Sequence, residues 1–268
     1  MRLRFLCAAT AALLAPMACT AGPAPAAAPP TAPGAETATL PATLAVPPFS
    51  MRYDVLHGNL KLGEATFTLK RDNGDWFFAW RAYPTGLAAV FVHSSFNETS
   101  RFYMVHGQIR PLAYSYTDTG HADRDETIDF DWGRKSAFDT NDGRKKTIAL
   151  APGMLDRISS LLAISLRLAA GLPLPTTYQV INGGRVRTYT VKELRKGTIK
   201  TPAGPFHTVV VQRSDSDSDK TLVVWLAPKY AWLPVRLEQR EPGETTDTSI
   251  LTRLKWLHTL PSSAASPQ

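Results

Sequence analysis

Residues 154–170, MLDRISSLLAISLRLAA, are a segment whose apolar residues recur at helical spacing. Ile158, Leu162 and Leu166 follow the period of one helix face, and the remaining apolar positions cover more than half of the circumference. Gly171 supplies a stop signal directly after the run. We therefore expect one helix here, buried rather than laid on a surface.

Most of the remaining sequence alternates apolar and polar residues with a period of two. In DETIDFDWG, residues 125–133, the apolar and aromatic residues lie on one side and the polar residues on the other. This pattern is typical of a strand with one buried and one solvent-exposed face. Asn182-Gly183-Gly184 between two such runs indicates a hairpin. About a dozen runs predict a mainly β fold: a large antiparallel curled sheet, a spiral or incomplete barrel, wrapped around one central α-helix.

The N-terminal residues have the order of a bacterial leader. Two arginines precede an apolar run that is too short to span a bilayer, and small residues follow it. If Cys19 is acylated, residues 1–19 are a lipoprotein-type signal peptide, and two acyl chains would anchor the protein. If ordinary cleavage occurs, it falls after Ala21. Both alternatives place the protein in the periplasm, and only the first attaches it to a membrane.

The predicted domain organisation follows from composition. Residues 20–50 form an Ala/Pro-rich linker, residues 51–260 one β-rich domain and residues 261–268 a disordered tail. Cys7 and Cys19 are the only cysteines, so the domain holds no disulfide and no thiolate metal site. The formal net charge of +7 is spread along the chain, which argues against a nucleic-acid partner.

Several short stretches in order are similar to an exported bacterial family known as domain of unknown function 3108. The stretches are Tyr53 with Leu62-Gly63, Gly86-Leu87, Leu155-Asp156 with Ser159, residues 201–206 (TPAGPF), and WLAP followed by LPVR within residues 225–236. This resemblance implies a periplasmic β-rich domain and no particular reaction. Related envelope proteins wrap a partial barrel around a helix, and lipoprotein carriers among them hold acyl chains there, which is an analogy of fold alone.

Motifs for metal binding or catalysis are weak. Asp215, Asp217 and Asp219 have calcium-loop spacing, but Lys220 and Leu226 replace the glycine and glutamate that an EF-hand needs, so we interpret this segment as a hairpin turn. HADRDE, residues 121–126, combines a histidine with three carboxylates that could act in acid–base chemistry. We predict no metal, no cofactor and no catalytic residue.

Three functions stay open. The first is a non-enzymatic envelope protein that binds a lipid, another apolar ligand or an envelope protein. The second is an envelope hydrolase or lyase that uses His121 with Asp123 or Asp125, and the third is a purely structural scaffold. At the helix head, Asp156 and Ser159 are expected to cap and register the helix, with Arg157 or backbone amides as partners of the Asp156 carboxylate. The residues expected to line a ligand cavity are Trp76, Trp80, Trp132, Trp225 and Trp232.

Overall fold

The computed structural model describes residues 44–257 and contains one large sheet. Its strands are β1 (Phe49–His57), β2 (Leu60–Asp72), β3 (Asp75–Pro84), β4 (Phe96–Val105), β5 (Gln108–Asp118), β6 (Glu126–Asp131), β7 (Ser136–Asn141), β8 (Arg144–Ala149), β9 (Leu155–Asp156), β10 (Thr177–Ile181), β11 (Val186–Thr201), β12 (Gly204–Asp215), β13 (Thr221–Ala227), β14 (Leu233–Arg240) and β15 (Asp247–Trp256). The helices are α1 (Ala88–Phe91) and α2 (Arg157–Ala169).

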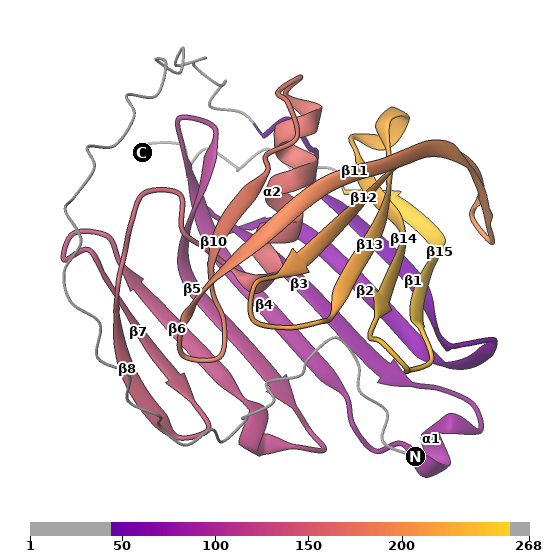
Figure 1. Ribbon diagram of the computed structural model, residues 1–268, viewed down its shortest axis with the longest axis horizontal. Helices are drawn as coiled ribbons and strands as arrows, with labels where there is room; N and C mark the ends of the chain where they lie inside the picture. The colour runs from indigo at the N-terminus through magenta and orange to yellow at the C-terminus, as the bar shows by residue number, and fades with distance from the viewer. Residues whose placement is uncertain (1–43, 258–268) are drawn as a thin grey trace, which may run out of the picture.

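The sheet is a meander whose ends do not pair. Its order runs from β8 to β1, continues with β15 and ends at β9, so that the first and last strands meet in the middle. All neighbours are antiparallel except β9 and β10. We call β1–β8 the first arm and β10–β15 the second arm. The sheet curls so that the arms face each other, with α2 between them in the view of Figure 1. The predicted mainly β fold with a large, curled, antiparallel sheet is confirmed.

The alternation of side chains along each strand places every second residue on the buried face of the sheet. In β6, Glu126, Ile128 and Phe130 are buried, whereas Thr127 and Asp129 are exposed. The predicted hairpin also forms, because β10 and β11 pair across the Asn-Gly-Gly turn. Both glycines of this turn have positive φ angles, 66° and 71°, which a residue with a Cβ adopts only with strain.

The structured chain begins earlier than the sequence boundary at residue 51. Val46 is buried, and β1 starts at Phe49, which pairs with Leu69 on one side and Trp256 on the other. These residues end an Ala/Pro-rich run, but ladder pairing on both sides draws Phe49 into the sheet. The leader, Cys19, most of the linker and the tail lie outside the described residues. Within residues 44–257, none of the helices has the length and apolar character needed to cross a membrane.

Helix α2 lies inside the predicted segment 154–170 and is apolar on several sides. Its buried residues are Ile158, Ser159, Ser160, Leu161, Leu162, Ile164, Ser165 and Leu166. The helix contacts strands of both arms, β3, β4 and β5 in the first and β10 in the second. At its far end the Ser165 hydroxyl donates to the Trp232 carbonyl at 2.8 Å. Packing against both arms therefore holds α2 in place.

Candidate functional site

The N-terminus of α2 is held by a fully buried carboxylate. Asp156 is the N-cap, and its Oδ1 accepts from the Ser159 backbone N–H at 2.7 Å. The Ser159 hydroxyl oxygen in turn accepts from the Asp156 backbone N–H at 3.2 Å, which completes a capping box. Ser100 on β4 donates its hydroxyl to Asp156 Oδ2 at 2.6 Å. One carboxylate thus caps the helix and fastens it to the first arm.

Arg157 makes a second connection from the helix to the first arm. Its Nε donates to Glu98 Oε1 at 2.8 Å, and the Tyr114 hydroxyl donates to the same oxygen at 3.0 Å. The guanidinium also lies 4.6 Å from the centre of the Tyr116 ring, in cation–π geometry. Because the Arg157 and Glu98 side chains are only 11% and 5% exposed, little water competes with their ion pair.

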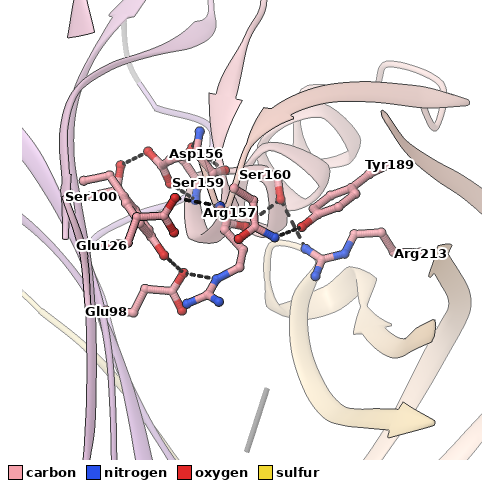
Figure 2. Close-up of polar contacts among 12 residues, drawn as sticks. Glu98, Ser100, Glu126, Asp156, Arg157, Ser159, Ser160, Tyr189 and Arg213 are labelled. Atoms are coloured by element: carbon pink, nitrogen blue, oxygen red, sulfur yellow. Dashed lines mark hydrogen bonds and ion pairs between the residues drawn. The ribbon is translucent and has the colours of Figure 1, made fainter. Parts of the chain in front are cut away.

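The second arm reaches the same helix turn through Arg213 on β12. The Arg213 Nη1 donates to the Ser160 hydroxyl oxygen at 3.2 Å, and its guanidinium lies 4.5 Å from the Tyr189 ring centre. Burial raises the pKa of Tyr189 and lowers the pKa of Arg213. Figure 2 shows Glu98, Ser100 and Glu126 on one side of the helix turn and Tyr189 with Arg213 on the other. The turn is therefore bonded to both arms.

A third set of contacts joins the arms directly, and we call it the seam: Glu126, Asp139, Lys146, Gly183 and Gly184. Glu126 Oε1 accepts from the backbone N–H groups of Gly183 at 2.7 Å and Gly184 at 3.4 Å. Lys146 Nζ donates to the Gly184 carbonyl at 3.2 Å. These bonds link β6 and β8 to the β10–β11 turn. Polar side chains thus bridge the arms where no β-ladder joins them.

Two carboxyl groups of the site hold protons more tightly than usual. Burial raises the pKa of Asp156 to about 6, although hydrogen bonds from Ser100 and Ser159 oppose the rise. Burial also raises the pKa of Glu126 to about 8; Arg157 lowers it and the neighbouring Asp139 carboxylate raises it. Burial also raises the pKa of the neighbouring Asp139, and a proton held by Glu126 can be shared with the Asp139 carboxylate.

These contacts define the helix-head cluster, which joins β4, β6, α2, β11 and β12. Its residues are Glu98, Ser100, Glu126, Asp156, Arg157, Ser159, Ser160, Tyr189 and Arg213. Asp156, Ser159 and Ser160 have no exposed surface. General acid–base catalysis needs a substrate within hydrogen-bond reach of the carboxyl group. In this conformation the cluster instead connects the two arms through α2, and we call this connection the clasp.

Residues 44–257 contain no group of three or more potential ligands arranged to hold a metal ion.

One cavity beside α2 is small, and none of its lining residues is a tryptophan. It encloses about 10 Å³ between the helix and the sheet, and its lining residues are Phe49, Met51, Phe67, Phe78, Leu161, Leu162, Ser165, Leu233 and Pro234. Of the five tryptophans expected to line a ligand site, Trp76, Trp80 and Trp225 are buried and Trp132 and Trp232 are half-buried. Trp80 stacks on Phe96 with ring centres 6.2 Å apart, a core contact.

The predicted pairing of His121 with Asp123 or Asp125 is not seen. His121 Nδ1 lies 3.3 Å from Asp118 Oδ2 instead, and the His121 side chain is exposed. Asp125 Oδ1 accepts from the Asp118 backbone N–H at 2.9 Å, which orders the loop, and Asp123 is exposed. The short 3₁₀ turn at residues 122–124 separates these groups.

The aspartate run at the end of β12 forms one largely buried ion pair and one exposed ion pair. Asp215 accepts from Arg187 Nη1 at 2.8 Å, and Asp217 lies 3.7 Å from Arg185. This geometry agrees with the hairpin-turn interpretation.

Sequence reasoning named Asp156, Ser159 and Arg157 but missed their partners. Glu98 and Ser100 were detectable, because they fall on the same face of β4 as Phe96 and Phe102, where a polar residue is unexpected. Glu126 likewise shares the buried face of β6. The signal that was overlooked is a polar residue at a position whose neighbours on the same face are apolar.

Comparison with solved structures shows the fold. A β-barrel-like protein of domain of unknown function DUF1849 from Brucella abortus is similar over 81% of this chain and all of its own, with 10% identity and a TM-score of 0.55. A protein described as exported, with a YmcC-like fold, from Bacteroides fragilis covers 81% of this chain and 98% of its own at 11% identity and a TM-score of 0.29. At 10% identity, the likeness to the Brucella abortus protein concerns the fold alone.

No curated protein matches the chain. The family model described as "Protein of unknown function (DUF3108)" matches residues 49–246, which span β1 to the loop before β15 and include every residue of the helix-head cluster. The chain therefore belongs to the DUF3108 family.

Proposed function

We propose that this protein is a non-enzymatic protein of the cell envelope that acts by binding a partner at its outer surface, with α2 as a central helix clasped by both arms. The observation that carries the proposal is the packing of α2 against both arms, with a polar contact to each. The cavity of about 10 Å³ has room for about one water molecule and none for an acyl chain. Of the alternatives derived from the sequence, an envelope partner fits this packing better than an enclosed ligand.

The helix-head cluster supports the same proposal. Separation of the arms would make room for a large ligand beside α2. That movement would break the Arg157–Glu98 ion pair or the Arg213–Ser160 hydrogen bond and expose buried charge. The cluster therefore favours a closed domain that presents its outside to other molecules. Its contacts explain rigidity, and they do not require a reaction.

The proposed location rests on the sequence of residues 1–19. An exported, periplasmic protein fits the leader-like order of these residues, and acylation of Cys19 would tether the domain to a membrane. Replacing Cys19 with serine and following the protein between membrane and soluble fractions tests the tether. Release of the variant would support it, and an unchanged distribution would exclude it as the main attachment.

Native mass spectrometry of the protein extracted from its own cells tests the binding mode. We expect the mass of the processed polypeptide, with any covalent acyl group, and no further lipid. The Cys19→Ser variant serves as the matched control, because it separates a covalent acyl group from a bound ligand. A lipid that is present under native conditions and lost on denaturation would contradict the surface-binding proposal.

A further inference from the structure

Exposed apolar side chains gather at one corner of the fold, which we call the apolar corner: Leu60, Tyr83, Leu87, Val90 and Phe91. They are the five most exposed large apolar residues of the described chain, from 45% for Tyr83 to 84% for Leu87. Pairing of the start of β2 with the end of β3 brings Leu60 towards the loop that carries the other residues. Figure 1 shows α1 at the lower right of the fold, away from α2.

The tip of the corner is uncharged and satisfies part of its own backbone. Residues 85–92, TGLAAVFV, contain no ionisable side chain. Within them the N–H groups of Ala89, Val90 and Val92 donate to carbonyls of Gly86, Leu87 and Ala88 at 2.8–3.2 Å. A segment that enters an apolar phase must leave neither charges nor backbone donors unpaired. This short turn meets the first condition and part of the second without a partner chain.

The shape and composition of the corner favour a lipid surface over a protein partner. A protein partner would need a surface that is complementary to the corner in shape, with a polar rim around it. Leu87 and Phe91 are more than 80% exposed, so they project instead of forming a flat patch. Projecting apolar side chains can enter a fluid acyl layer without a complementary shape.

The length of the chain before the domain allows this contact together with an anchor. The 24 residues between Cys19 and Leu44 span at most about 80 Å. Strand β1, whose far end leads to the apolar corner, is only about 30 Å long. An acyl group at Cys19 and the apolar corner could therefore reach the same membrane.

We infer that the apolar corner, with α1 as its tip, inserts into a lipid surface of the cell envelope. The inference deepens the proposed function, because it names lipid as the partner at the outer surface. A native mass measurement on the variant with Leu87→Ser and Phe91→Ser reports on the interior, and the following experiment reports on the corner, so either can fail without the other.

The absence of cysteine from the domain allows a site-specific test. In the full chain with Cys7→Ser and Cys19→Ser, Val90→Cys carries an environment-sensitive fluorophore, and Phe138→Cys on β7 carries it in a matched control. Vesicles of phosphatidylethanolamine and phosphatidylglycerol should raise and blue-shift the emission at position 90 only. Unchanged emission at position 90 would overturn the inference. A shift that appears without vesicles and grows with protein concentration would replace lipid with a second copy of the chain.

Vesicle flotation gives an independent measurement. Because two large apolar contacts are removed, Leu87→Ser with Phe91→Ser should weaken vesicle binding by about 100-fold or more. Phe138→Ser removes an exposed apolar side chain elsewhere and should leave binding unchanged. Equal loss in both variants would indicate nonspecific adsorption and would refute a specific role for the corner.

Discussion

Replacing Glu126 with glutamine should remove a pH dependence of stability that the seam creates. Glutamine keeps the shape and can still accept from the Gly183 N–H through its carbonyl oxygen, while its amide can donate to Asp139. It cannot ionise. The parent protein instead holds Glu126 protonated when folded, because burial raises its pKa from 4.5 to about 8.

The direction of this pH dependence follows from proton binding at Glu126. Between pH 4.5 and 8 the folded state binds more protons at Glu126 than the unfolded state, so its contribution is present at low pH and is lost as the pH rises towards 8. Asp156 acts in the same direction, but its pKa of about 6 limits its effect largely to lower pH. From pH 6.5 to 8 the parent should therefore lose roughly 1.5–2 kcal/mol of stability through Glu126.

Urea unfolding of the parent and Glu126→Gln at pH 6.5, 7, 7.5 and 8 measures this difference. The free energy of unfolding of the variant, relative to the parent, should rise by roughly 1.5–2 kcal/mol across the series. Asp129→Asn, on the exposed face of the same strand, is the matched control and should follow the parent. A variant-to-parent difference that stays constant with pH would refute the shared-proton account of the seam.

Three further substitutions test the helix and its clasp by urea unfolding. Asp156→Ala removes the N-cap and leaves the Ser100 hydroxyl and the Ser159 backbone N–H without their acceptor, so the free energy of unfolding should fall by about 1–3 kcal/mol. Retention of full stability would contradict the capping role. Arg157→Met leaves the Glu98 carboxylate buried without its ion pair and should cost about 3–5 kcal/mol, whereas a cost below about 1 kcal/mol would show that the pair is well hydrated. Leu162→Ala should cost about 2–5 kcal/mol through a core cavity, and Arg134→Ala, an exposed control, should cost almost nothing.

The contacts of the candidate site that could be predicted are those between residues close together in the sequence. Asp156 and Ser159 are three residues apart at the start of a helix, so their cap could be anticipated from spacing alone. Their partner Ser100 comes from a strand 56 residues earlier. Of the two expected partners of Asp156, the backbone amide of Ser159 does bind it, whereas Arg157 pairs with Glu98. Spacing within a segment specifies a helix cap, whereas the partner of a charged side chain depends on which strand packs against it.

The sequence by itself determined the alternation of strands, the Asn-Gly-Gly hairpin and the apolar segment that becomes α2, because periodicity and turn chemistry act over a few residues. Only the tertiary structure decided that β1 pairs with β15 and that Glu126 meets the Gly183 N–H from the other arm. It also decided that Leu87 and Phe91 stay exposed although they are apolar. Contacts between residues far apart in the chain depend on how the whole sheet curls, and no local pattern encodes that curvature.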